Sequence, residues 1–371
     1  MMDGHTGRGE ASERLCSRKD FLRLAGAAGV GVAFVPILAT ACVPPGGKLD
    51  QRALAKVGPK GQQDWKVSEG VGSCDVKPPD VAFEDATFGF AQSENNNPWR
   101  IAQTASMRSA AEANGVTLIV TDAQSSTPKQ VSDIQDMVAQ GVDLLFVPPR
   151  EEEGIAPALE SAREANVPVF FVDREANAKI CKQYITFMGS DFVRQGERAA
   201  EWLAKATNGK AKIVELQGTL GASVTADRGK GFRQGLKGRP GMEVIVSQTG
   251  NFTRADGQTV TEQIIGAYPD LTAVYAQNDE MAIGAIQALT DGGFTPGKDV
   301  TVVSVDGERD ALQAIIKGEL GATVETNPRF GSLAFDTAKK FLSGQPVPER
   351  IFVQDHLFDK SNAKKYVGSA Y

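Results

Sequence analysis

The sequence predicts an α/β fold of two doubly wound parallel-sheet lobes joined by a multi-strand hinge. The clearest unit is residues 271–289 (LTAVYAQNDEMAIGAIQAL), where an apolar strand runs into Gln277, Asn278 and Asp279 and then directly into a helix. The same strand, loop and helix order recurs from residue 86 onward. Units of this kind build parallel sheets with helices on both faces. A chain of 371 residues is long enough for two lobes that each bury a core.

The first series of elements has clear helix boundaries. Asn97 and Thr127 can each cap a helix, and the proline that follows each of them suits a first helical position because no backbone donor is missed there. Gly115 and Gly141 end these two helices. A third helix is expected over about 154–166. The strands are expected at 86–91, 116–121, 142–147 and 167–172.

A second series begins near residues 189–191 with a helix that carries Trp202 and Leu203. Its further helices are entered at Asp227-Arg228, around 260–265 and after Asn278, and its strands are expected at 211–216, 242–247, 271–276 and 300–305. The last elements are helices 310–317 and 329–342 with strands 322–325 and 350–355, which could return to the first sheet and cross again. The predicted lobes are 83–189 plus 326–354, and 190–325 plus 355–371.

Residues 1–42 predict an export signal, because a polar start is followed by an apolar run over 21–41. Residues 17–22 (SRKDFL) resemble a twin-arginine signal with Lys19 in place of the second arginine, which favours the Tat route over Sec. Residues 38–42 (LATAC) resemble a lipobox, so Cys42 is the predicted lipidation site. The alternative is an uncleaved membrane anchor. Both readings place the remaining chain outside the cytoplasm, tethered to the membrane.

Residues 43–82 are predicted to be a tether or loosely ordered extension, since they are rich in glycine, proline and charge and have no sustained period. Beyond Cys16 and Cys42, the chain contains only Cys74 and Cys181. In an oxidising compartment these two could pair and attach the extension to the first lobe. Two unpaired structural cysteines are the alternative, and the sequence leaves the choice open.

Composition argues against several classes of function. The net charge is −6 and the basic residues are not clustered, so no nucleic-acid partner is expected. His5 and His356 are the only histidines, which leaves too little material for a histidine-based triad or a zinc site. The glycines of 26–31 lie in the leader rather than after a strand, and 229–235 does not match a phosphate loop. We therefore expect no catalysis, no cofactor and no metal.

Polar side chains follow the ends of several predicted strands, at the edge where open α/β sheets bind ligands. Carboxylates, guanidinium groups and amides together suit a neutral polyol, whose hydroxyls both donate and accept hydrogen bonds. Trp99 and Phe252 could supply flat apolar faces for a sugar ring, or could belong to the core. The strand-end residues are the loop 92–97, Asp173 and Arg174, Gln217 and Gly218, Asn278, and Asp306.

Each strand-end residue also has a purely structural interpretation. Asp173 and Arg174 could form an exposed ion pair of little consequence. Asn278 could serve only as a helix cap, and Asp306 with Gly307 could be an ordinary turn. Their shared position at strand ends favours a binding site.

Several long segments resemble the periplasmic sugar-binding proteins of ABC importers of the ribose and galactose type, and galactofuranose-binding proteins in particular. These segments are PVFFVDR (168–174), VELQGTLGASVTADRGKGF (214–232), SQTGNFTRADG (247–257), VYAQNDEMAIGAIQAL (274–289), GKDV (297–300) and SVDG (304–307). The resemblance implies a type I periplasmic-binding fold, a monosaccharide ligand such as galactofuranose, galactose or a pentose, and an ABC permease as partner. We expect a monomer.

The resemblance also implies which residues contact sugar hydroxyls. The first loop, QSENNNPWR (92–100), departs from the Gly/Ser-rich loop of the galactofuranose type, which leaves the sugar open. A sugar-sensing module for chemotaxis or signalling is the alternative function, followed by an α/β enzyme that acts on sugars. Near the last crossing the candidate is Glu325 or Asn327. The predicted ligand-binding residues are Asn96, Asn97, Trp99, Arg100, Asp173, Arg174, Arg228, Phe252, Asn278, Asp306 and Glu325.

Overall fold

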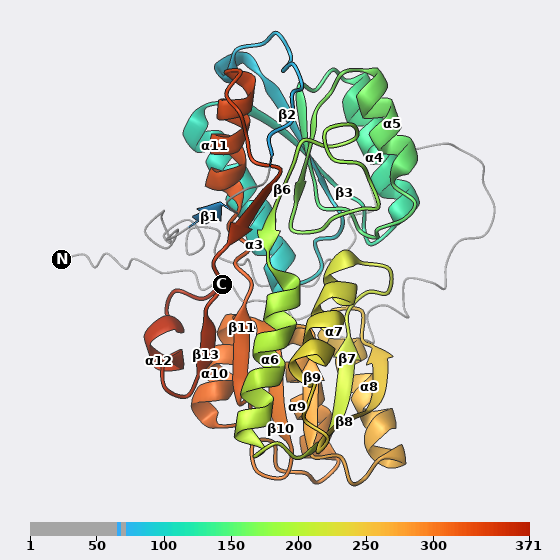
Figure 1. Cartoon of the computed structure of the whole chain (residues 1–371), viewed down its shortest axis with the longest axis vertical. Helices are drawn as coiled ribbons and strands as arrows, with labels where there is room; N and C mark the ends of the chain where they lie inside the picture. Colours follow the sequence, from blue (N-terminus) through green and yellow to red (C-terminus); the bar gives the residue numbers. More distant parts are fainter. Residues whose placement is uncertain (1–64, 68–71) are drawn as a thin grey trace, which may run out of the picture. The chain divides into compact units, whose positions relative to one another are not determined.

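The structure is a computed structural model that describes residues 65–67 and 72–371. These residues form two lobes, each built on a mostly parallel sheet with helices on both faces (Figure 1). The predicted export signal, the lipidation site Cys42 and most of the predicted tether lie outside the described residues. The fold class predicted from the sequence is confirmed.

The first lobe contains a seven-stranded sheet with the order β1-β12-β6-β5-β4-β2-β3. All neighbouring strands are parallel except β1, which is antiparallel to β12. The strands are β1 (Trp65–Val67), β2 (Thr87–Gln92), β3 (Thr117–Asp122), β4 (Leu144–Val147), β5 (Val169–Val172), β6 (Thr186–Ser190) and β12 (Arg350–Val353). The helices are η2 (Phe83–Asp85), α3 (Pro98–Asn114), α4 (Thr127–Ala139), α5 (Ala156–Glu164) and α11 (Gly331–Leu342).

The sequence explains how the first two long helices begin. Asn97 caps α3 through its side-chain oxygen, which accepts a hydrogen bond from the Arg100 backbone amide at 2.9 Å, and Gly115 ends the helix with φ 68°. The predicted cap of α4 was Thr127, but the cap is Ser126, whose hydroxyl accepts from the Lys129 amide at 3.3 Å. The prediction is off by one residue because Ser126 keeps extended backbone angles while Thr127 is already helical.

The second lobe contains a six-stranded sheet with the order β13-β11-β10-β9-β7-β8, in which only β13 is antiparallel to its neighbour. Alternate residues of β9 face opposite sides: Tyr275 stacks on Phe232, while Val274 joins the cluster on the other face. The strands are β7 (Ala211–Gln217), β8 (Met242–Thr249), β9 (Ala273–Ala276), β10 (Thr301–Asp306), β11 (Ala322–Glu325) and β13 (Leu357–Asp359). The helices are α6 (Phe192–Ala206), α7 (Ser223–Gly235), α8 (Arg254–Ala267), α9 (Asp279–Asp291), α10 (Arg309–Lys317) and α12 (Ala363–Tyr366).

The chain passes between the two sheets after β6, between β11 and α11, and between β12 and β13. These crossings form the hinge between the lobes. The sequence analysis did not predict β1, which lies in the predicted tether, nor η2, β6, β13 or α12. The β6 segment (TFMGS) is short and is not followed by a long polar loop, so no local pattern separates it from α6. The start of α7 was also predicted too late, at Asp227 instead of Ser223. The first turn of this helix lacks an apolar stripe that would have revealed it.

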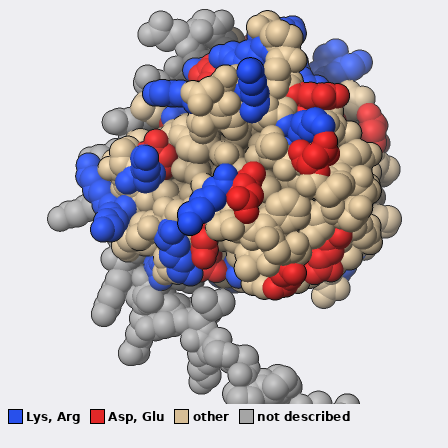
Figure 2. Space-filling model, turned by 90° about the horizontal axis from the view of Figure 1, so that it is seen from below, with Lys and Arg blue, Asp and Glu red and all other residues tan. Residues whose placement is uncertain are grey.

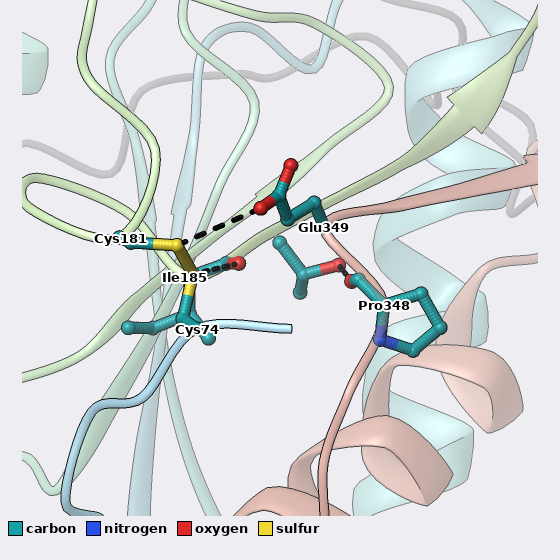
Figure 3. Close-up of a disulfide and its surroundings, with 6 residues drawn as sticks. Cys74, Cys181, Ile185, Pro348 and Glu349 are labelled. Carbon is teal, nitrogen blue, oxygen red and sulfur yellow. Dashed lines mark hydrogen bonds between the residues drawn. A yellow bond between two sulfur atoms is a disulfide. The ribbon is translucent and has the colours of Figure 1, made fainter. Parts of the chain in front are cut away.

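A disulfide joins Cys74 to Cys181, with the two Cα atoms 5.0 Å apart, which settles a pairing that the sequence left open. Figure 3 shows it beside Ile185 and Glu349. Nearby, Ser73 forms a β-bridge with Pro348, and β1 pairs with β12. These described parts of the predicted tether are therefore attached to the first sheet.

The face seen in Figure 2 carries Lys, Arg, Asp and Glu side chains dispersed among wide uncharged areas. Its charges are therefore mixed in sign. Among the residues that the structure describes, none of the helices combines the length and the apolar character that a membrane span requires.

Replacing Cys74 and Cys181 together with serine is expected to lower the free energy of unfolding by about 2–4 kcal/mol, because the bridge closes a long loop in the unfolded chain. The two cysteines are 107 residues apart. Guanidinium denaturation with and without a thiol reductant measures the effect. The reductant should weaken the wild type and leave the variant unchanged. Equal midpoints for wild type and variant without reductant would contradict this expectation.

Candidate functional site

A cavity lies where the carboxyl ends of strands from both sheets meet. The first lobe, the second lobe and one hinge crossing all contribute to its lining. All the predicted ligand-binding residues except Asn96 and Glu325 line this cavity. The lining residues are Asn97, Trp99, Arg100, Asp173 and Arg174 from the first lobe, Val224, Arg228, Phe252, Asn278 and Asp306 from the second, and Thr326 from the crossing.

The first-lobe wall is built from buried ion pairs. A guanidinium nitrogen of Arg100 lies 2.8 Å from a carboxylate oxygen of Asp173. The closer partner of Arg174 is Glu94, whose carboxylate oxygen lies 2.9 Å from Arg174 Nη2. The Asp173 carboxylate is farther away, at 3.9 Å from Arg174 Nε. Asp173 and Arg174 are 4% and 3% exposed, so they are not the exposed ion pair that the sequence left as an alternative.

Glu94 belongs to this group although the sequence analysis did not single it out. It lies just past β2, and its carboxylate accepts hydrogen bonds from Arg174 at 2.9 Å and from the Ser125 hydroxyl at 3.1 Å. Burial raises the pKa of Glu94, but the positive charges of Arg174 and Arg100 outweigh burial and bring the pKa down to about 2. Glu94 is therefore ionised at neutral pH. In the sequence, its position in the first strand-end loop was the only indication that it belongs to the site.

Arg228 organises the second-lobe wall. It donates from Nη2 to Asp306 at 3.0 Å and to the Thr326 hydroxyl at 2.7 Å, and from Nη1 to the Gln277 carbonyl at 2.5 Å. Burial raises the pKa of Asp306 to about 6, although the Arg228 charge opposes this rise. Asp306 is thus mostly ionised at neutral pH and can accept hydrogen bonds from a ligand.

Close packing of α6 against α7 brings Gln195 to Arg228. A Cβ atom on Gly196 would lie 2.1 Å from the Arg228 carbonyl oxygen, and one on Gly231 would lie 1.9 Å from the Val193 carbonyl oxygen. Only glycine allows the two helices to approach this closely. As a result, the Gln195 side-chain oxygen accepts a hydrogen bond from Arg228 Nε at 3.0 Å.

The same Gln195 amide connects the site to the hinge. Its nitrogen lies within hydrogen-bond distance of the Glu325 carbonyl (3.1 Å), the Thr326 hydroxyl (3.0 Å) and the Asp355 carboxyl (2.7 Å). Glu325 is the last residue of β11, Thr326 begins the crossing from β11 to α11, and Asp355 belongs to the crossing between β12 and β13. Gln195 therefore joins Arg228 to two of the hinge segments.

The backbone is strained at several of the lining residues. Asp173, Phe252 and Asp306 have φ values of 70°, 60° and 132°, which side-chain-bearing residues rarely adopt. Strain of this kind persists only where surrounding contacts hold it, and it is frequent at ligand sites. One such contact is the hydrogen bond that the Asn278 amide donates to the Phe252 carbonyl at 3.1 Å.

Three residues fulfil the structural role that the sequence left as an alternative and also line the cavity. Asn278 does cap α9, since its side-chain oxygen accepts from the Met281 amide at 3.0 Å, and it also lines the cavity. Trp99 and Phe252 are each 6% exposed, as core residues are, yet both line the cavity. The Trp99 indole donates to the Thr326 carbonyl at 2.9 Å, which connects the first lobe to the hinge.

Asn96 and Glu325 do not line the cavity. Asn96 is exposed, and its amide donates to the Ser125 hydroxyl at 3.4 Å. The Glu325 carboxylate turns to His356, while the next residue, Thr326, reaches the cavity. Side chains alternate along an extended segment, so a shift of one residue changes which face a side chain takes. Val224 also lines the cavity and had no polar signal in the sequence.

The hinge carboxyl Asp355 gives a pH dependence that can be tested. The residue is partly exposed, yet its two carboxyl oxygens accept from Ser190 and Gln195, and burial raises its pKa to about 7. A raised pKa means that the folded state holds the proton more tightly than the unfolded state. The contribution of Asp355 to stability is therefore present at low pH and is lost as the pH rises from about 4 to about 7.

Asp355→Asn cannot titrate, so we expect its melting temperature to fall less than that of the wild type between about pH 5 and about pH 8. Calorimetric melting of both proteins across this range measures the difference. Other buried acids titrate equally in both proteins and cancel. Parallel pH profiles would show that Asp355 does not titrate in this window.

Comparisons with known proteins agree with this architecture. A family model described as a periplasmic binding protein domain matches residues 88–346. The galactofuranose-binding protein YtfQ of Escherichia coli is 40% identical over 76% of this chain and 92% of its own length. The ribose import binding protein RbsB of Bacillus subtilis is 36% identical over 75% of this chain and 91% of its own length.

A solved structure extends the likeness to three dimensions. It is the binding protein of the arabinose ABC transporter from Shewanella sp. ANA-3, bound to α- and β-L-arabinofuranose. It matches 76% of this chain and 95% of its own, with a TM-score of 0.74 and 36% identity. The matched range, the two lobes and the cavity between them together place this chain in the periplasmic binding protein family.

Proposed function

We propose that this protein is the extracytoplasmic substrate-binding protein of an ABC sugar importer and that it binds a monosaccharide in the cavity between its lobes. The observation that carries the proposal is the set of buried charged and amide side chains that converge on the cavity from both lobes. In this proposal the protein is a monomer, is exported, is anchored to the membrane through a lipid on Cys42, and performs no catalysis.

The chemistry of the lining supports a sugar. Asp173 and Asp306 can accept hydrogen bonds from hydroxyl groups, while Arg174 and Arg228 donate to hydroxyl oxygens. Each such bond contributes about 0.5–3 kcal/mol, so several around one desolvated ring support micromolar or tighter binding.

The names of the relatives narrow the class of sugar. They bind galactofuranose, ribose and arabinofuranose, which are a hexose in its furanose form and two pentoses. We propose that the ligand of this chain is galactofuranose, a galactose-like hexose or a pentose.

Closure of the lobes would give the permease its signal. The two lobes touch beside the cavity, where the Glu152 amide donates to the Gly221 carbonyl at 2.7 Å and the Glu175 amide donates to the Ser223 hydroxyl at 3.0 Å. A ligand that contacts both lobes interacts more with the closed form than with an open one and therefore shifts the population toward closure. The permease would then recognise the closed form.

A thermal-shift panel of pentoses and hexoses, including galactose in both ring forms, tests the proposal, because a ligand that binds only the native state raises the melting temperature. Calorimetric titration of the best sugar should then give at least about tenfold weaker binding for Arg174→Ala, which loses a buried donor. Arg163→Ala is the matched control, since Arg163 is exposed and pairs with Glu160 on the surface of the same lobe. No shift with any sugar would argue against the proposed function, and unchanged affinity would remove Arg174 from the site.

A further inference from the structure

The charges that line the cavity do not balance by themselves. Arg100, Arg174 and Arg228 contribute three positive charges, and Asp173 and Asp306 contribute two negative charges, which leaves a net charge of +1. A cavity with an unbalanced guanidinium group would favour an anionic ligand, because arginine pairs strongly with carboxylates and phosphates. A neutral sugar offers no charge to offset the excess.

Glu94 supplies the missing negative charge without lining the cavity. One of its carboxylate oxygens lies 2.9 Å from Arg174 and 3.6 Å from Arg100, both of which do line it. The other oxygen accepts a hydrogen bond from the Ser125 hydroxyl at 3.1 Å, which fixes the carboxylate behind the two arginines. At 4% exposure, Glu94 acts on its partners with little screening by solvent.

The other charged groups nearby do not take over this role. The Arg150 guanidinium pairs with its neighbour Glu151, so this pair adds no net charge. Asp279 and Glu308 lie deeper in the second lobe, where burial and the proximity of the carboxyl groups raise both pKa values, that of Asp279 to about 8. Both shifts favour the neutral form of these two groups, whereas Glu94 forms ion pairs with two arginines that line the cavity. We therefore assign the balancing charge to Glu94.

We propose that Glu94 is a specificity-determining residue that makes the cavity selective for neutral sugars over sugar acids. Glu94 occupies the Nη2 donor of Arg174, and a uronate would have to bind beside two fixed carboxylates, Glu94 and Asp173. This inference rests on the proposed function and deepens it. The loop that carries Glu94 is also the loop in which the sequence departs from the galactofuranose type.

The test uses D-galactose, L-arabinose and D-galacturonate, which share their ring configuration and differ only in the group attached at C5. Calorimetric titration of the wild type should give binding of a neutral sugar at least about tenfold tighter than binding of galacturonate. Tighter binding of galacturonate by the wild type would overturn the inference without any variant.

Glu94→Gln keeps the shape of the side chain and removes its charge. We expect it to weaken binding of the neutral sugar and to shift the preference toward galacturonate by about tenfold or more. The glutamine oxygen can still accept the hydrogen bond from Arg174, but the cavity gains a net positive charge. Glu94→Asp retains the charge and should keep the wild-type preference. The same shift in both variants would mean that the charge of Glu94 does not set the preference.

Two controls separate the possible failures. Glu84→Gln, on the exposed surface of the same lobe, should leave both affinities unchanged, because Glu84 only approaches Lys339 at 3.6 Å. Thermal melting without ligand reports whether each variant folds. If the wild type binds none of the sugars in the wider panel, the proposed function fails and this inference fails with it. If the wild type binds a neutral sugar and Glu94→Gln keeps the same preference, this inference alone fails.

Discussion

The buried guanidinium group of Arg228 is the feature on which the relation between the lobes depends. A buried cation is costly unless its donors are all met, and removing one partner of a buried ion pair is more costly than never having formed it. Arg228 meets this requirement with Asp306 and the Gln277 carbonyl from the second lobe, and with Thr326 from the hinge. The cavity wall and the hinge segment are therefore held by one side chain.

This arrangement gives a physical route from ligand to hinge. In the proposed function, a ligand hydroxyl bound to Asp306 or Arg228 would change the hydrogen bonds of the guanidinium group. Gln195 accepts a hydrogen bond from this guanidinium group and also contacts Thr326 and Asp355 in two hinge crossings. On the other side of the cavity, the Trp99 indole bonds to the Thr326 carbonyl. Both cavity walls thus contact the same crossing, and we propose that occupancy of the cavity and the angle of the hinge are linked energetically.

The sequence was sufficient for the features that depend on local order. Asn278 and Asp306 could be placed at the cavity because each follows an apolar strand, and parallel strands bring their carboxyl ends to one edge. Gln195 could not be placed, because its partner Arg228 is 33 residues away on another helix and the contact depends on how closely those helices pack. Glu94 could not be singled out for a related reason, because its importance depends on two arginines that only the fold brings next to it.

The central claim is that a sugar binds between the lobes and closes them. The distance between the two rims measures this directly, with spin labels at Glu153→Cys in the first lobe and Leu220→Cys in the second, both exposed positions, after Cys16 and Cys42 are replaced by serine. Pulsed electron resonance should show a distance distribution that shortens and narrows when the best sugar of the panel is added at saturation. An unchanged distribution, with binding confirmed by calorimetry on the same sample, would contradict the account.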